Sequence, residues 1–209
     1  MPLIIKRMQP ILYAVAFLCV LSGLSRAEVA DASAAGFTLR ISEKIQAAPD
    51  EVYRKLTHNV GEWWSPRYTY SRDSSNVTLD DRPGGCFCEK LPGGGGVKYM
   101  EIVYAAPGKL LRMTGALGPF QPLAATGSMS IQLSPAASGA TDLQVTYAVA
   151  WYEPSGLDKR APLAETVIGD QFIRLKNYVE KGTPEPKDGA AIPSTRTPVK
   201  CTATAYSRD

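Results

Sequence analysis

The feature that most constrains the fold of this chain is one long amphipathic segment, from Asp158 to Lys181. Its apolar residues recur three to five positions apart, which places them along one stripe of a helix. These residues are Leu163, Val167, Ile168, Phe172, Leu175 and Val179. Burying each such side chain contributes roughly 1.5–3 kcal/mol, so the helix must pack on a large apolar surface. Only the strand-like sequence before it offers one. We therefore predict a curved sheet that holds this helix, with any function in the space between them.

The N-terminal residues 1–27 have the pattern of a signal peptide. Two basic residues precede an apolar run at 11–21, and Ser25-Arg26-Ala27 then supplies the small residues that a signal peptidase requires. The run is too short to cross a bilayer stably, and an uncleaved membrane anchor is the alternative. We predict cleavage after Ala27, with Ala30-Asp31-Ala32 as the second choice. The product would be a bacterial protein that is periplasmic or secreted and has no stable membrane anchor.

Cleavage after Ala27 would also change the charge of the chain. It removes Lys6, Arg7 and Arg26 and no acidic residue, which lowers the number of basic residues from 23 to 20, equal to the 20 acidic ones. A formally neutral chain lacks the positive surface that binding to a phosphate backbone requires. We therefore expect no nucleic-acid partner, and the sequence identifies no protein partner.

The segment before the long helix alternates between strand and turn patterns. Residues 37–45 alternate apolar and polar side chains, as in a half-buried strand, and only Glu43 interrupts the pattern. Two short helices follow, the first beginning at Pro49, and from residue 76 the pattern predicts strands separated by turns. The expected organisation is a signal peptide at 1–27, a short linker at 28–36, one folded domain at 37–181 and a disordered tail at 182–209. The tail is too polar to bury enough surface to offset the cost of ordering it.

Three cysteines would remain after cleavage, so at least one is free or pairs outside the chain. Cys86 and Cys88 are two apart on a predicted strand and share a face. Their Cα atoms should lie about 6.5–7 Å apart, at the upper limit for a disulfide. We expect two small buried thiols. The alternatives are a redox-active pair, or a bond from one of the two to Cys201.

Four short motifs occur in order along the chain. They are Ala48-Pro49-Asp50-Glu51-Val52-Tyr53, Glu62-Trp63-Trp64-Ser65-Pro66, Gly84-Gly85-Cys86-Phe87-Cys88-Glu89 and Pro107-Gly108-Lys109-Leu110-Leu111-Arg112. With these motifs, residues 37–181 resemble the START-like, polyketide-cyclase-like superfamily often labelled SRPBCC, and within it the heat-shock-ATPase-activator-like group. The resemblance implies an α+β helix-grip fold, in which an antiparallel sheet of about seven strands wraps around the helix at 158–181. It also implies an apolar cavity between them, which is a plausible ligand site because it is concave and preformed.

Aromatic residues are the first candidates for binding a ligand in such a cavity. Trp63 and Trp64 diverge by about 100° on a helix, so one should lie in the core and the other should cover the mouth of the cavity. Tyr147, Trp151 and Phe172 are candidates for the cavity wall. For all five residues the alternative is an ordinary place in the core.

Two further residues complete the candidate site. Leu163 marks the end of the long helix near which we expect the ligand. Arg112 lies in an otherwise apolar strand. If it points inward it could pair with a ligand carboxylate, with Glu89 or with Glu101; if it points outward it is an ordinary solvated side chain.

No catalytic or metal-binding set is visible in the sequence. His58 is the only histidine, and the glycine run at 93–96 is not followed by the residues of a phosphate-binding loop. We therefore predict no metal and no cofactor, and we favour a protein that binds a small hydrophobic or amphipathic molecule; the sequence leaves enzyme activity open. One alternative is an enzyme of the cyclase or hydrolyase kind, in which cavity tyrosines and Glu89 or Glu101 move protons on a polyketide-like or aromatic substrate. The other is a co-chaperone-like interaction module that uses the outer face of the sheet.

Overall fold

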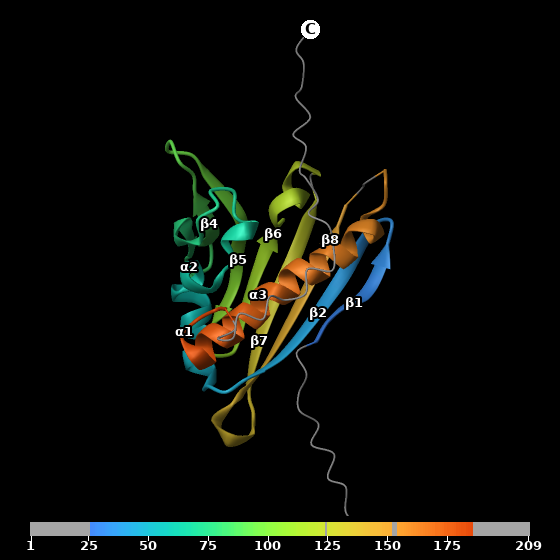
Figure 1. Cartoon of the computed structure of the whole chain (residues 1–209). Coiled ribbons are helices and arrows are strands. Elements are labelled where there is room, and N and C mark those ends of the chain that lie inside the picture. The colour runs from blue at the N-terminus through green and yellow to red at the C-terminus, as the bar shows by residue number, and fades with distance from the viewer. Residues whose placement is uncertain (1–25, 124, 152–153, 186–209) are drawn as a thin grey trace, which may run out of the picture.

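The computed structural model describes residues 26–123, 125–151 and 154–185, and in it one curved antiparallel sheet holds a long helix (Figure 1). The sheet has eight strands in the order β1-β2-β8-β7-β6-β5-β4-β3. The strands are β1 (Arg26–Ser33), β2 (Gly36–Ile45), β3 (Val77–Leu79), β4 (Cys86–Lys90), β5 (Gly96–Ala106), β6 (Leu110–Gly115), β7 (Thr126–Pro135) and β8 (Thr141–Ala150). The predicted α+β class, with a curved sheet and a long C-terminal helix, is confirmed. Most of the predicted signal peptide and tail, with Cys201, lies outside the described residues.

The inner face of the sheet follows the alternation of the sequence. In β2, Phe37, Leu39, Ile41 and Ile45 are all buried. Glu43, which interrupts the apolar pattern, is also buried on this face, and the Nζ atom of Lys176 lies 3.6 Å from its carboxylate. The strand therefore continues through Glu43 because a cation from the helix lies beside the buried acid.

The strand count is eight rather than seven because of β1. Residues 28–36 were predicted to be a short linker, but most of them form β1 and the turn to β2. β1 pairs antiparallel with β2 from Arg26 opposite Ser42 to Ser33 opposite Gly36. Its sequence is polar and small and shows no alternation, so its main local support is the hydrogen-bonding edge of β2.

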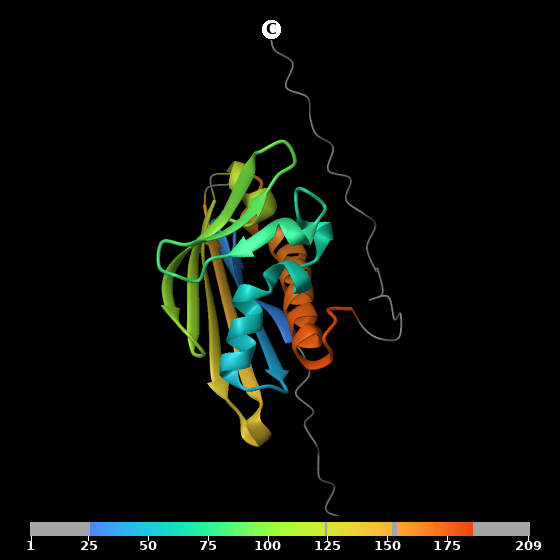
Figure 2. The same ribbon diagram turned by 90° about the vertical axis from the view of Figure 1, so that its left-hand side faces the viewer.

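Three helices lie on one face of the sheet, as Figure 2 shows. α1 (Pro49–His58) begins with proline and two acids, as predicted, and α2 (Val60–Trp63) ends just before Ser65-Pro66. α3 (Ala161–Lys181) ends at Gly182, whose left-handed conformation (φ 76°) lets its N–H bond to the Tyr178 carbonyl oxygen at 3.0 Å. The core fills the space between these helices and the inner face of the sheet.

The buried stripe of α3 differs from the predicted one at its N-terminal end. A 3-10 turn at Leu157–Arg160 precedes the helix, so α3 begins at Ala161 rather than Asp158. The apolar side chains that face the core are Ala161, Ala164, Ile168, Phe172, Leu175 and Val179. This series of three- and four-residue steps leaves Leu163 on the outer side of the helix, where it is 54% exposed.

Candidate functional site

Side chains fill the space between the sheet and α3 except for a small cavity of about 20 Å³. Its lining is entirely apolar and comes from Leu56, Val60, Trp63, Trp64, Leu79, Phe87, Met113, Leu117, Met129, Ile131 and Phe172. A volume of this size accommodates about one water molecule. In this conformation aromatic and aliphatic side chains fill most of the space between the sheet and α3.

Four aromatic rings form the centre of this lining. Trp63 packs edge-on against Trp64 with ring centres 5.5 Å apart, and it also approaches Phe172 at 6.4 Å. Trp64 in turn packs edge-on against Phe87 at 5.0 Å. Both tryptophans are buried, so neither lies at an open mouth.

The two indole N–H groups differ in their partners. The Nε1–H of Trp63 donates to the carbonyl oxygen of Lys55 at 3.2 Å. The Nε1 atom of Trp64 is buried and has no hydrogen-bond partner among the described residues. A buried donor without an acceptor costs about 1–3 kcal/mol relative to a satisfied one. Trp64, one of the lining residues, therefore has a buried donor that no described residue uses.

Two polar residues of α3 hold the tryptophans in place. The Gln171 side chain accepts a hydrogen bond from the Ser65 N–H at 2.8 Å. The Nε–H of Arg174 donates to the Trp63 carbonyl oxygen at 2.9 Å. Both side chains are buried, although the sequence pattern placed Arg174 outside the stripe. α3 thus fixes the backbone on both sides of Trp64.

A buried carboxylate lies outside the cavity. Glu89 is only 1% exposed, and its carboxylate accepts hydrogen bonds from the Tyr70 N–H at 3.0 Å, the Ser71 N–H at 2.5 Å and the Tyr99 hydroxyl. Burial acts to raise the pKa of Glu89, but the hydrogen bonds from Ser71, Tyr99 and Tyr70 outweigh it and hold the pKa below its usual value. Burial, together with the Glu89 carboxylate, raises the pKa of Tyr99. Glu89 is therefore an ionised anchor for the loop at 70–71.

Of the predicted site residues, Trp63, Trp64 and Phe172 come together in the cavity lining. Tyr147 faces the core from β8 and is fully buried, but it is not part of that lining. Its hydroxyl oxygen accepts a hydrogen bond from the Leu117 N–H at 3.4 Å, and burial raises its pKa to about 12. Tyr147 thus supports the Leu117 loop beside the cavity.

The other three predicted site residues do not line the cavity. They are Arg112, Trp151 and Leu163. Arg112 lies on the outer face of the sheet, where its Nε–H donates to the Ser130 hydroxyl at 2.9 Å and its guanidinium lies over the Tyr104 ring. Trp151 follows the last residue of β8 and is 46% exposed, because the strand ends before the alternation reaches it. Leu163 points away from the sheet for the reason given above.

Several residues of the cavity lining were not predicted as site residues. Met129 and Ile131 were recognisable as one side of an alternating strand, and Phe87 lay between the two cysteines. Leu117 gave no signal, because it belongs to a loop rich in glycine and proline. Its place in the lining depends on how the connection from β6 to β7 folds over the end of the sheet.

A second, open hollow of about 290 Å³ lies on the other side of α3. It is lined by Ala27, Pro162, Glu165, Thr166, Gly169, Asp170 and Ile173. This hollow is larger than the interior cavity, but it is a surface groove with two acidic side chains at its rim. It lies between the N-terminal end of β1 and the first half of α3.

Cys86 and Cys88 form a disulfide with their Cα atoms 5.4 Å apart. We expected two buried thiols, because a regular strand places such residues farther apart. The difference comes from a bulge: the pairing register between β4 and β5 shifts between Phe87 and Cys88, which bends the strand. Both cysteines are partly exposed rather than buried.

Metal clusters and membrane-spanning helices are both absent from the described residues. No group of three or more histidine, cysteine, aspartate or glutamate side chains there could hold a metal ion. No helix in this part of the chain is long and apolar enough to cross a membrane.

Comparisons with known proteins support the fold alone. No protein-family model matches the chain, and no curated protein gives a significant sequence match. Among solved structures, the conserved protein of unknown function EF2215 from Enterococcus faecalis is 16% identical, with a TM-score of 0.53, over 78% of this chain and 81% of its own.

Two further solved structures are similar at a lower level. A protein from Arthrobacter aurescens is 14% identical with a TM-score of 0.49, over 76% of this chain and 94% of its own. CalU16 from Micromonospora echinospora is 18% identical with a TM-score of 0.43, over 72% of this chain and 78% of its own. The class that fold and site together define is an α+β protein with one curved sheet closed over a long helix.

Proposed function

We propose that this chain is an exported START-like protein with a helix-grip fold, which binds a small hydrophobic or amphipathic molecule between the sheet and α3. The observation that carries the proposal is the apolar lining of the interior cavity, in which one residue, Trp64, also has a buried N–H donor without a partner among the described residues. A ligand with a carbonyl or ether oxygen would satisfy this donor while its apolar part occupies the rest of the site. The similarity to the Enterococcus faecalis protein supports the fold on which the proposal rests.

Binding requires that the cavity open. Ligand sites usually measure at least about 300 Å³, far more than the 20 Å³ present. Two lining residues, Met113 and Met129, have flexible unbranched side chains that can change rotamer at low cost. Leu117 belongs to the connection between β6 and β7 rather than to the sheet, so its displacement breaks no strand pairing. These three side chains are the ones we expect to move.

The enzymatic alternative has less support from the site. None of the described residues that line the cavity is ionisable. Glu89 is fully engaged by the loop at 70–71 and Tyr99, and Glu101 bonds Lys98 at 2.9 Å outside the core. Neither carboxylate is therefore placed to move protons on a molecule bound between the sheet and α3.

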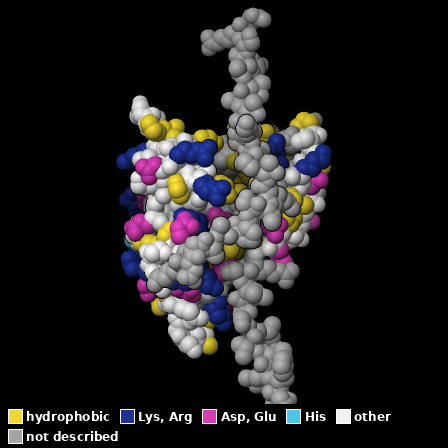
Figure 3. All heavy atoms as spheres, viewed as in Figure 1, with side chains coloured by type: hydrophobic (Ala, Val, Ile, Leu, Met, Phe, Trp, Pro, Cys, Tyr) yellow, Lys and Arg dark blue, Asp and Glu magenta, His cyan; other side chains and the backbone are white. Residues whose placement is uncertain are grey.

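Two observations support export and the expected choice of partners. Disulfides such as Cys86–Cys88 form mainly in oxidising compartments. Basic and acidic side chains are interspersed over the face seen in Figure 3, without a single-sign patch of the kind that binds nucleic acid. N-terminal sequencing of protein from the periplasmic fraction should give Glu28 as the first residue. Retention of Met1 in that fraction would contradict the signal-peptide prediction.

The first test of ligand binding is native mass spectrometry of protein purified from its own compartment, followed by organic extraction. We expect a bound apolar species, or binding of one from a library of lipids and aromatic compounds. Trp64→Phe keeps an aromatic ring while it removes the donor and part of the ring volume, so it should weaken binding about fivefold, as expected for the loss of one hydrogen bond. Trp151→Phe is the matched control, because this exposed residue is outside the lining. A protein that stays empty against the whole library would overturn the proposal.

A further inference from the structure

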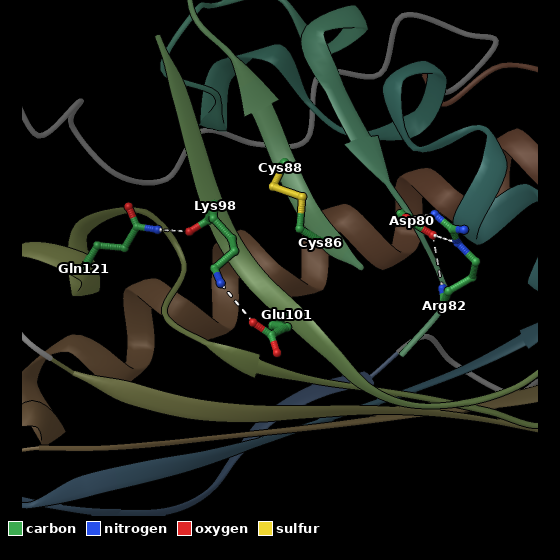
Figure 4. The surroundings of a disulfide bond; sticks show 7 residues. All are labelled: Asp80, Arg82, Cys86, Cys88, Lys98, Glu101 and Gln121. Atoms are coloured by element: carbon green, nitrogen blue, oxygen red, sulfur yellow. Dashed lines mark hydrogen bonds and ion pairs between the residues drawn. A yellow bond between two sulfur atoms is a disulfide. The ribbon is translucent and has the colours of Figure 1, made fainter. Parts of the chain in front are cut away.

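The disulfide between Cys86 and Cys88 lies on the face of the sheet that is turned away from α3. Along β4, Phe87 and Glu89 are buried, whereas the two cysteines are partly exposed. Figure 4 shows the disulfide along β4, with the side chains of Lys98 and Glu101 on the neighbouring strand. Reagents can therefore reach the pair without entering the core.

This disulfide contributes little to the stability of the sheet. The stabilisation from a cross-link grows with the length of the loop that it closes, and here only one residue separates the two cysteines. Hydrogen-bonded neighbours already hold Cys88, which lies opposite Thr78 of β3 and Lys98 of β5. Phe87 points inward and packs on Trp64 and Tyr99. Opening the disulfide would therefore leave the core packing in place.

Charged groups of opposite sign flank the two ends of the disulfide. Cys88 lies opposite Lys98, and Lys90 follows two residues later on the same exposed side. Cys86 lies opposite Glu101, which pairs with Lys98 at 2.9 Å. The only other charged groups drawn near the disulfide in Figure 4, Asp80 and Arg82, pair with each other at 2.7 Å. The strand register thus places Lys98 and Lys90 around Cys88 and Glu101 opposite Cys86, and a cation near a cysteine stabilises its thiolate.

We propose that Cys86–Cys88 is a redox-active disulfide that exchanges with a dithiol, either a peptide or a small molecule. One thiolate of the dithiol attacks Sγ of Cys86, the bond between the sulfurs breaks, and Cys88 leaves as a thiolate beside Lys98. The second thiolate of the dithiol then attacks the mixed disulfide and releases Cys86. The dithiol is oxidised to its disulfide, and the two electrons and two protons that it loses are taken up by Cys86 and Cys88. The proposal does not depend on ligand binding in the cavity.

The test is an exchange equilibrium with glutathione, measured on the purified full chain. The chain is incubated in mixtures of reduced and oxidised glutathione, and free thiols are trapped by alkylation. Peptide mapping then reads Cys86 and Cys88 separately from Cys201 and, in an uncleaved chain, from Cys19. Structural disulfides resist reduction by the glutathione pool. We expect the pair to become mostly reduced at about 10 mM reduced glutathione. A pair that stays oxidised there would overturn the proposal.

Charge variants distinguish exchange at this site from general fragility. Lys98→Met removes the cation beside the leaving thiolate and should shift the exchange constant about threefold toward the disulfide. Glu101→Gln removes the carboxylate and should shift it about threefold toward the dithiol. Lys109→Met, in the turn after β5, is the matched control and should leave the constant unchanged. Shifts of the same sign for the first two variants, or no shift in either, would also overturn the proposal.

Discussion

Replacing Glu89 by glutamine should destabilise the fold, because the carboxylate anchors a loop from inside the protein. Three donors converge on it: the N–H groups of Tyr70 and Ser71 and the hydroxyl of Tyr99. The Tyr99 hydroxyl can rotate to accept from the new amide group, but one backbone N–H must then face a donor. An unsatisfied buried donor costs about 1–3 kcal/mol, and the remaining bonds lose their charge assistance. Removing a buried charge offsets part of this. We expect a net loss of about 2–3 kcal/mol in the free energy of unfolding.

The same substitution should change the response of the protein to acid. The folded-state pKa of Glu89 lies below the ordinary value of 4.5. Its contribution to stability is therefore complete above about pH 4.5 and is lost as the pH falls through the lower folded-state pKa. In Glu89→Gln this part of the acid dependence should be absent, so the variant and the parent should approach each other in stability toward low pH.

Urea unfolding followed by tryptophan fluorescence, at neutral pH and at several acidic values, measures both effects. Glu101→Gln is the matched control, because this side chain is partly exposed and bonds only Lys98; it should change stability by less than about 0.5 kcal/mol. Equal stability of the two variants at neutral pH would refute the role of the Glu89 carboxylate as an anchor. So would an acid dependence of Glu89→Gln that equals that of the parent.

Three further substitutions test the packing of α3. Phe172→Ala should cost about 3–5 kcal/mol in urea unfolding, because the ring is buried, whereas the half-exposed Ile173→Ala should cost less than about 1 kcal/mol. Gln171→Leu leaves the buried Ser65 N–H without its acceptor and should cost about 1–3 kcal/mol; Thr166→Leu, on the exposed side of α3, should be neutral within about 0.5 kcal/mol. An added Cβ at Gly169 would lie 2.8 Å from the Cβ of Ala27. In a chain cleaved after Ala27, Gly169→Ala should therefore stabilise the folded protein by about 1 kcal/mol in thermal unfolding. In an uncleaved chain the close contact should remove that gain. Equal effects in the two chains would contradict this account.

Local patterns were enough to predict the class of fold. The alternation in β2 and the start of α1 at Pro49 depend on residues within a few positions of one another, so they are visible in the sequence. The length of the α3 segment also required a large apolar partner, and hence a sheet. These features depend on backbone geometry that each segment carries by itself.

The candidate site was only partly predictable, because its lining depends on how separate segments pack together. Phe172 was a candidate for the cavity wall, and of Trp63 and Trp64 one was expected in the core and one at the cavity mouth. All three line the small cavity. Which other residues join them depends on how α3 crosses the sheet. That crossing directs Arg174 into the interior, where the sequence pattern placed it outside the stripe.

Three features could be seen only in the tertiary structure: the pairing of β1 with β2, the disulfide and the size of the cavity. The edge of β2 pairs with β1, which has no strand pattern of its own. A bulge brings Cys86 and Cys88 within reach of each other. Packing between the sheet and α3 sets the cavity at about 20 Å³. The first two depend on pairing between consecutive strands rather than on a local residue pattern, and the third depends on packing between segments distant in the sequence. The sequence by itself therefore determined a sheet around a helix, whereas only the folded structure decided how much space remains between them.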